Sequence, residues 1–239
     1  MPAADFLSHF EELRRRLIVV ACFFLMACVV SFFFSHQILD FLTVPLRRIS
    51  QADLFFQKPY DAFLIHLQAA AFSGLIFSSP VFFTQAWLFA APGLYEKEKK
   101  FLLPAILLSV LLFLLGAAFA YGAAVPFGLS FLLSYQTESL KPLLNVESYF
   151  SFLSGMIIGF GIFFDFPVIL TGLVALKVVK TETLSRARKG IVVFIFFAAA
   201  VLTPSPDPLS QIMLAVPLWI LFEASLWICR VIEKKAGKR

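Results

Sequence analysis

Six apolar runs, separated by short polar segments, constrain this sequence more than any other feature. Most are about 20 residues long, the length that an α-helix needs to cross the roughly 30 Å hydrocarbon core of a bilayer. Of the 239 residues, 60% are hydrophobic and 15% are charged, a balance far from that of soluble domains. We therefore predict an all-α membrane protein with six transmembrane helices. The runs are residues 17–37, 66–90, 102–125, 151–176, 190–204 and 210–229.

The basic residues are distributed unevenly around these runs. With six crossings, sixteen of the 20 lysines and arginines lie on the side of the N-terminus. Cytoplasmic loops carry such an excess, so both termini are predicted to be cytoplasmic. We attribute the net charge of +5 to contact with anionic lipid, because no basic soluble face suggests nucleic acid. No linker interrupts the chain, so residues 1–239 are predicted to form one domain.

The remaining polar segments and the last two runs have distinct features. Residues 38–65 and 126–150 contain prolines and amphipathic stretches, so we expect partly helical segments along the outer surface. Spans five and six are predicted to be short. The run from Gly190 to Leu202 is followed at once by three prolines in TPSPDP, which end the helix. Such a span either thins the bilayer or lies against longer neighbours, and the sequence favours neither.

The fourth run contains an acid, Asp165, near its middle. A carboxylate at that depth costs about 2.5–3.5 kcal/mol and needs a partner, a proton or water. Pro167 should free the carbonyl of Phe163 and kink the helix beside the acid. Gly161 and Gly172 lie near the same helical face, where small residues allow another helix to approach closely. We predict a polar docking point here, with a static internal hydrogen bond as the alternative.

Two acidic pairs lie on the predicted cytoplasmic side. Glu11 and Glu12 precede the first run, and Glu96 and Glu98 lie in the loop after the second. An interfacial basic loop explains the lysines of that loop, but it does not explain acids beside an anionic leaflet. Because carboxylates bind guanidinium groups with paired hydrogen bonds, the two pairs together could hold a basic ligand. The alternative for Glu12 is a charged helix start, in which it pairs with Arg16 one turn later.

The other chemically active side chains indicate no catalytic or metal site. No nucleotide-binding, metal-binding or nucleophile motif is present, so we predict no enzyme activity, cofactor or metal. Glu223 lies nearer the cytoplasmic end of the sixth run and could extend to the interface. The cysteines are interpreted as buried apolar residues and the histidines as ordinary interfacial residues. These are Cys22, Cys28, Cys229, His9, His36 and His66.

Four motifs in order resemble those of the TatC family, the large multi-span subunit of the twin-arginine protein translocase. They are HFEELRRRL before the first run, FAAPGLYEKEKK after the second, an acid-x-Pro in the fourth, and LTP…D…SQ between the fifth and sixth. The resemblance implies a receptor and core component that binds twin-arginine signal peptides on the cytoplasmic face. It would help to move folded proteins across the bacterial inner membrane, using the proton-motive force. It would work in homo- and hetero-oligomers with TatA-type and TatB-type single-span subunits.

The resemblance also implies roles for particular residues. Asp165 replaces the Glu that the family usually carries, and Lys100 stands where the family often has Arg. Pro45 matches the proline of the family's first outer loop. Glu223 is included among the predicted intramembrane contacts because of its position in the sixth run, and not because of the resemblance. The signal-peptide site would comprise Glu12, Phe89, Glu98 and Lys100, and the intramembrane or partner contacts Asp165, Asp207, Gln211 and Glu223.

A proton-coupled small-molecule transporter is the alternative function, with Asp165 as the proton or substrate site. Inverted repeats and paired broken helices would favour it, and the sequence shows neither. For the receptor, we expect a curved bundle whose concave face is lined by Asp165. The hydrophobic part of a signal peptide would lie along that face.

Overall fold

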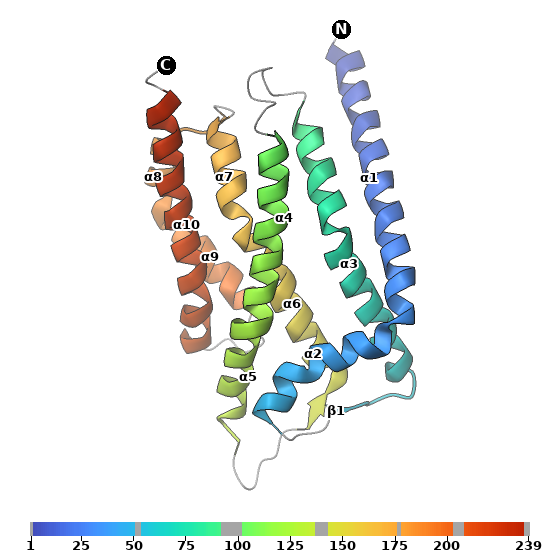
Figure 1. Ribbon diagram of the computed structural model, residues 1–239. Coiled ribbons are helices and arrows are strands. Elements are labelled where there is room, and N and C mark those ends of the chain that lie inside the picture. Colours follow the sequence, from blue (N-terminus) through green and yellow to red (C-terminus); the bar gives the residue numbers. More distant parts are fainter. Residues whose placement is uncertain are drawn as a thin grey trace. The chain divides into compact units, whose positions relative to one another are not determined.

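The chain is almost entirely helical in the computed structural model, which describes residues 2–50, 54–91, 102–136, 143–175, 178–202 and 208–236 (Figure 1). Within those residues, five helical segments are long and apolar enough to cross a membrane. Five of the six predicted runs overlap them, so the prediction of a multi-pass helical membrane protein is confirmed. The segments are His9–Phe33, Asp61–Ala90, Leu102–Leu133, Val146–Val174 and Leu214–Val231.

The last two runs differ in length. Helix α9 (Arg188–Leu202) has 15 residues, about 22 Å at 1.5 Å per residue, which is shorter than the bilayer core. Its predicted shortness is confirmed, and its role as the fifth span stays a prediction. Helix α10 (Pro208–Ala236) has 29 residues, although its candidate span covers only 18. The sixth helix is therefore longer than expected, because its polar last turns continue beyond the apolar stretch.

The chain divides into two compact units. The first comprises Met1–Phe41 and Tyr60–Val110, and its centre is the pair of helices α1 (Pro2–Phe33) and α3 (Asp61–Ala90), which run alongside each other (Figure 1). The two backbones approach closely at Gly74. A Cβ atom there would lie 2.6 Å from Cys28 Sγ and 2.9 Å from Cys28 N. Only a residue without a side chain permits this approach.

The second unit comprises Leu42–Pro59 and Leu111–Arg239. It contains most of the third membrane segment, which begins as α4 (Leu102–Phe119), passes through the π-helical turn η3 (Ala120–Ala124) and ends as α5 (Val125–Leu133). The sequence placed the end of this run at residue 125, before Pro126, and that boundary is wrong. Proline is tolerated in the first turn of a helix because it lacks only an N–H that needs no partner there, and the π-turn just before it lets the helix continue.

The fourth membrane segment is interrupted at Asp165, as predicted. Helix α6 (Val146–Phe164) ends there and α7 (Phe166–Ala175) begins one residue later. The Asp165 amide donates to the carbonyl of Ile162 at 3.1 Å, which is a tighter turn than the α-helix. Pro167 has no amide hydrogen for the carbonyl of Phe163 four residues earlier. The break therefore has the cause that the sequence indicated.

Close packing around glycines also joins α4 to α6. A Cβ at Gly116 would lie 2.6 Å from the backbone oxygen of Phe160, and one at Gly161 would lie 2.7 Å from the ring of Phe113. The rings of Phe119 and Phe160 pack beside this contact, with centroids 5.5 Å apart. The predicted role of Gly161 in close helix packing is confirmed.

The segment after α1 forms helix α2 (Ser35–Ile49), which contains Pro45, so the predicted partly helical character is confirmed there. The short strands β1 (Leu54–Phe55) and β2 (Leu144–Asn145) pair in parallel. The hydroxyl of Tyr149, at the start of α6, donates to the carbonyl of Leu42 in α2 at 2.6 Å. A buried Tyr hydroxyl needs such an acceptor, and this bond joins α6 to the part of α2 that belongs to the second unit.

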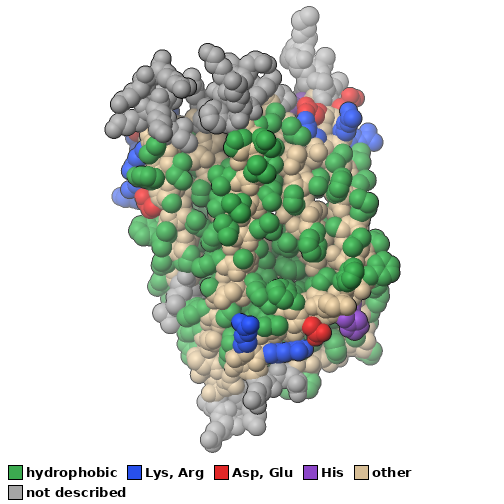
Figure 2. Space-filling view, viewed as in Figure 1, with side chains coloured by type: hydrophobic (Ala, Val, Ile, Leu, Met, Phe, Trp, Pro, Cys, Tyr) green, Lys and Arg blue, Asp and Glu red, His purple; other side chains and the backbone are tan. Residues whose placement is uncertain are grey.

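Most charged side chains in the described part of the chain lie towards the ends of the helices, with Asp165 and Glu223 as exceptions. On the face shown in Figure 2, apolar side chains cover the middle lengths of the helices, and the coloured acids and bases gather near the helix ends. Short helix α8 (Thr181–Arg186) contributes the exposed pair of Glu182 and Arg186, whose atoms Oε1 and Nη2 are 2.7 Å apart. This distribution is typical of helices whose middles contact lipid.

The contact at Gly116 can be tested by adding one methyl group. Gly116→Ala should lower the free energy of unfolding by about 1–3 kcal/mol, because the methyl meets a backbone oxygen that cannot rotate away. Gly155→Ala, in α6, is the matched control, because nothing lies within 4 Å of a Cβ there and alanine favours helix over glycine by about 1 kcal/mol. Thermal unfolding in detergent measures both. Equal midpoints for the two variants would contradict the packing assignment.

Candidate functional site

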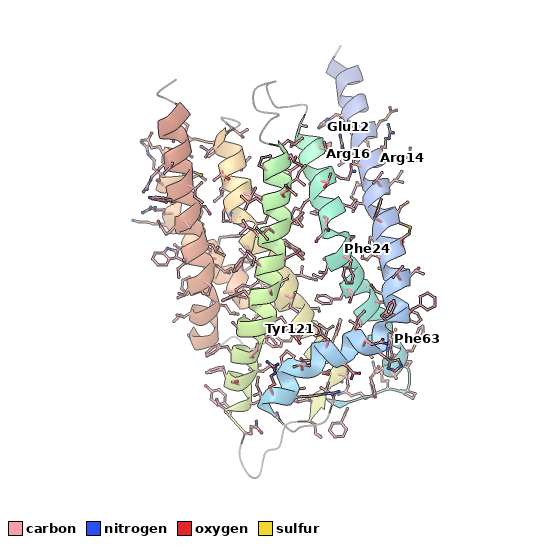
Figure 3. The ribbon with its side chains drawn as sticks, in the orientation of Figure 1. Glu12, Arg14, Arg16, Phe24, Phe63 and Tyr121 are labelled. Carbon is pink, nitrogen blue, oxygen red and sulfur yellow. The ribbon has the colours of Figure 1, made fainter. Side chains whose placement is uncertain are left out.

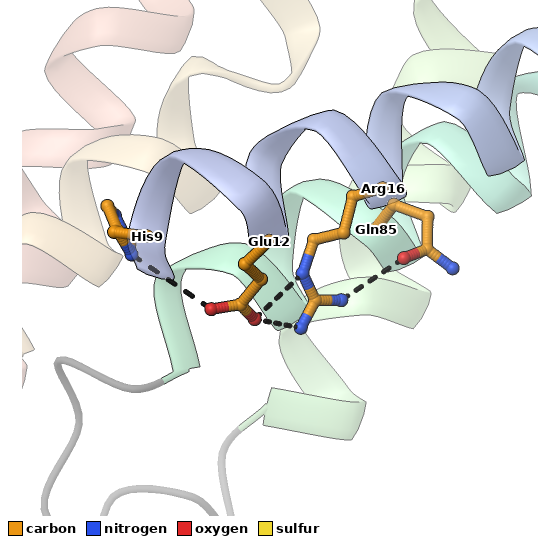
Figure 4. A network of polar contacts seen from close by, with 4 residues as sticks. All are labelled: His9, Glu12, Arg16 and Gln85. Atoms are coloured by element: carbon orange, nitrogen blue, oxygen red, sulfur yellow. Dashed lines mark hydrogen bonds and ion pairs between the residues drawn. The ribbon is translucent and has the colours of Figure 1, made fainter. Parts of the chain in front are cut away.

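A polar network joins the beginning of α1 to the end of α3 (Figure 4). Arg16 donates from Nε and Nη2 to a single carboxylate oxygen, Glu12 Oε1, at 3.0 and 2.5 Å. Its third nitrogen, Nη1, donates to Gln85 Oε1 on α3 at 3.1 Å. Glu12 and Arg16 lie on the side of α1 that faces α3, and Arg14 lies on the opposite side (Figure 3). The predicted pairing of Glu12 with Arg16 is confirmed.

His9 connects this network to Phe89. The two rings stack with their centroids 4.4 Å apart, and His9 Nδ1 lies 4.0 Å from the second oxygen of Glu12, Oε2. The structure thus brings Glu12 and Phe89, both predicted for the signal-peptide site, to one place through His9. The sequence predicts His9 only as an ordinary interfacial residue and does not indicate its contacts with Phe89 and Glu12. Its spacing of three residues from Glu12 was the available signal.

The network is partly buried. The side chain of Arg16 is 22% exposed and that of Glu12 is 32% exposed. A buried charge needs an opposite charge nearby and partners for its hydrogen bonds. Arg16 has both, because the Glu12 carboxylate supplies the opposite charge and the Gln85 amide oxygen accepts its remaining hydrogen bond. Glu12 is therefore held in one orientation, with Oε1 bonded to Arg16 and Oε2 beside His9. A carboxylate so placed can accept hydrogen bonds from a cationic ligand.

The helices on either side of residues 92–101 are joined by a partly buried hydrogen bond. Trp87, on α3, donates from Nε1 to Ser109 Oγ on α4 at 3.0 Å, and Ser109 is fully buried. Residues 92–101 lie outside the described part of the chain, and so do the predicted site residues Glu98 and Lys100. Phe89 is the described residue of the site nearest to that loop in sequence.

Three of the four residues predicted as intramembrane or partner contacts lie at helix junctions of the second unit. Asp165, at the break between α6 and α7, is 3% exposed. Gln211 Nε2, on α10, donates to the backbone carbonyl of Phe196 on α9 at 2.8 Å. Glu223 Oε2, on α10, accepts from Arg188 Nη2 at the start of α9 at 2.9 Å. Asp207 lies outside the described residues. Gln211 and Glu223 thus both connect α10 to α9.

No group of three or more His, Cys, Asp or Glu side chains within the described ranges could hold a metal ion. The chemistry available around Glu12 is recognition by charge and hydrogen bonding.

Comparison with known proteins decides the family. The sequence model of TatC, described as Sec-independent protein translocase protein, matches residues 8–217. The chain belongs to the TatC family. It is 37% identical over 238 residues to TatC of Magnetococcus marinus, covering 99% of this chain and 88% of that protein. It is 36% identical over 233 residues to TatCy of Bacillus subtilis, covering 97% and 91%.

A solved structure agrees with this assignment. The chain superposes with a TM-score of 0.84 on a crystal structure of the twin-arginine translocase receptor TatC in DDM. The two are 34% identical, and the match covers 92% of this chain and 98% of the other. The resemblance seen in the sequence motifs is therefore confirmed across nearly the whole chain.

The bond between Trp87 and Ser109 provides a test of how the site is supported. Ser109→Ala should lower the free energy of unfolding by about 1–3 kcal/mol, because it leaves the partly buried indole N–H of Trp87 without its acceptor. Ser154→Ala is the control, since that hydroxyl bonds the Ser151 carbonyl of its own helix at 3.2 Å. Thermal unfolding in detergent compares them. A Ser109→Ala midpoint equal to the control would show that the bond contributes nothing.

Proposed function

We propose that this TatC-family chain is the receptor subunit of a twin-arginine translocase. It binds the paired arginines of a signal peptide on the cytoplasmic face and helps to move folded cargo across the bacterial inner membrane. The observation that carries this proposal is the convergence of Glu12 and Phe89 through His9, near the end of α3, after which the sequence continues into the segment 92–101 that contains Glu98. Family membership favours a translocase component over the proton-coupled transporter. Recognition and movement of cargo need no covalent chemistry, in keeping with a family that is not enzymatic.

The binding mode follows from the chemistry of the guanidinium group. Two adjacent arginines carry two flat, permanently charged forks. Glu12 and Glu98 each offer a carboxylate, and pairing of guanidinium with carboxylate is strong when both partners are partly removed from water. Phe89 adds an aromatic face over which a guanidinium can stack. Lys100 is the last member of the proposed site, where its ammonium group would interact with carboxylate or carbonyl oxygens of the peptide.

We propose a topology of six spans with both ends in the cytoplasm, in which α9 is the short fifth span. The distribution of basic residues supports it, because sixteen of 20 fall on one side of such a chain. Helix α9 is shorter than the thickness of a typical bilayer core, so the membrane thins beside it or neighbouring helices cover its ends. Transport would draw on the proton-motive force.

The partners we propose are TatA-type and TatB-type single-span subunits and further copies of this chain. Asp165, Asp207, Gln211 and Glu223 are the proposed membrane-embedded contacts. Gln211 and Glu223 have internal bonds, to Phe196 and Arg188. A partner helix that used either side chain would therefore replace an existing bond, which suits a contact that forms only during transport.

Charge reversal of the loop acid tests the site. Glu98→Lys should weaken binding of a twin-arginine signal peptide by at least about a hundredfold, because it replaces a carboxylate that attracts the arginines by a positive charge that repels them. A twin-lysine peptide should bind the wild type poorly. Photo-crosslinking of a labelled peptide to the loop gives the measurement. Glu182→Lys is the matched control, because the side chain of Glu182 on α8 is exposed. Normal binding by Glu98→Lys would show that the site assignment is wrong.

Reporter fusions test the topology. A reporter joined after Lys100 should be active in the cytoplasm, and one joined after Glu138 should be active on the outer side, because the two positions flank the third span. An outward location for the segment 92–101 would contradict the proposed function, since cargo from the cytoplasm could not reach it.

A further inference from the structure

We propose that the junction of α8, α9 and α10 is a binding site for the phosphate headgroup of an anionic phospholipid. Basic side chains from α9 and α10 hold the phosphate, and apolar side chains beside them contact the acyl chains. These helices all belong to the second unit. The site uses none of the residues proposed to bind the signal peptide, so the two proposals can fail separately.

The first observation is that cations from two helices meet at this junction. Arg188 is the first residue of α9, and Arg230 lies near the end of α10. Arg230 Nη2 donates to Ser185 Oγ on α8 at 3.4 Å. Helical backbone bonds continue across the boundary between α8 and α9, so Ser185 and Arg188 lie about one turn apart on one face. The Arg230 side chain is thereby directed towards the face that carries Arg188.

The second observation is that these cations have few acidic partners. Glu223 accepts one bond from Arg188 Nη2 at 2.9 Å, whereas Arg188 Nε has no hydrogen-bond partner within the described residues. Lys189 and Arg230 are exposed and form no ion pair in that part of the chain. A guanidinium that gives one bond to a carboxylate still has donors for a phosphate oxygen. The junction therefore has positive charge to offer an anion.

The sequence around the junction has the same excess. Residues 180–189 and 223–236 together carry seven lysines and arginines and three glutamates. In Figure 2, basic side chains lie at the left edge of the view near its upper end, where Figure 1 shows α8 and the last turns of α10. The three glutamates leave most of this charge without a counter-ion from the same segments.

The third observation is the position of the cations at a boundary between polar and apolar surface. The candidate membrane span of α10 ends at Val231, one residue after Arg230, and the apolar stretch of α9 begins after Lys189. Trp227 and Ile228 are exposed just before Arg230. Tryptophan is enriched where headgroups meet acyl chains. A phosphate held by these cations would therefore lie at headgroup depth, with its acyl chains against exposed apolar side chains.

The combination of phosphate and acyl chain distinguishes a lipid from a soluble anion. A free phosphate gains only the charge contacts, whereas a phospholipid also covers Trp227 and its apolar neighbours. Under the proposed topology this end of the helices faces the cytoplasm, where the leaflet carries anionic lipid. A basic residue near such a surface strengthens the attraction about fivefold. The expected ligand is therefore the phosphodiester of an anionic phospholipid.

The test places the full chain in nanodiscs of phosphatidylcholine that contain a small share of phosphatidylglycerol with brominated acyl chains. Bromine quenches tryptophan fluorescence on contact, and subtracting the quenching measured in Trp227→Phe isolates the contact at Trp227. The preference is the ratio of quenching by brominated phosphatidylglycerol to quenching by brominated phosphatidylcholine at the same share. We expect a ratio of about five for the wild type and below about two for Lys189→Gln/Arg230→Gln.

Arg14→Gln/Arg15→Gln is the matched control, because it removes the same two charges from exposed positions on α1, in the first unit. Its ratio should stay at the wild-type value. Lys189→Gln and Arg230→Gln alone should each give an intermediate ratio. Either single variant tests the proposal if the double variant does not fold, which its thermal unfolding midpoint reveals.

Three outcomes would overturn the proposal. The first is a folded Lys189→Gln/Arg230→Gln that keeps the wild-type ratio. The second is an equal fall in the α1 control, which would show that net charge alone attracts the lipid. The third is loss of the preference in inorganic phosphate but not in sodium chloride of equal ionic strength, which would show that the site takes free phosphate. No peptide enters the assay, so its result is independent of the proposed function.

Discussion

Close backbone contact at glycine is the interaction on which both units depend. Lipid is as apolar as a leucine side chain, so helices in a membrane gain little from burying apolar surface against one another. They gain from dispersion contacts, which require short distances. Gly74 allows α3 to reach the backbone of α1 at Cys28, and Gly116 allows α4 to reach the carbonyl of Phe160. Larger residues at these points would separate the helices and remove the contacts on either side.

Polar bonds between helices then fix which ends meet. Arg16 bonds Gln85 across α1 and α3, and Trp87 bonds Ser109 across α3 and α4. In the second unit, α10 is joined to α9 near one end by Gln211 and nearer the other by Glu223. The bonds of Arg16, Trp87 and Glu223 satisfy polar groups that would be costly to leave without partners in a partly buried position. The candidate site is the junction between α1 and α3. The bond from Arg16 to Gln85 that joins the two helices also sets the position of Glu12.

The sequence predicted those parts of the fold that depend on local physical rules. The lengths of the apolar runs identified most of the spans. Pro167 identified the break at Asp165, because the effect of its missing amide hydrogen is confined to the preceding turn of the same helix. The end of the third span was misplaced, since a π-turn before Pro126 depends on the backbone of that one helix and leaves no compositional trace. Likewise Glu12 and Arg16 could be paired from their spacing. Gln85 and Phe89 lie more than 60 residues further along the chain, so only the packing of α1 against α3 brings them to His9 and Arg16.

The occupied state of Glu12 follows from the same requirements. An acid that is to bind arginine must lie where water is partly excluded, because an exposed pair is worth little. In that position the empty acid needs a counter-charge of its own. Arg16 supplies it, and a guanidinium on α1 is therefore present before any ligand arrives. A site that is stable when empty must hold something similar to its ligand, and the ligand must then compete with it. Under the proposed function, competition between Arg16 and an incoming arginine is a consequence of making the unliganded site stable.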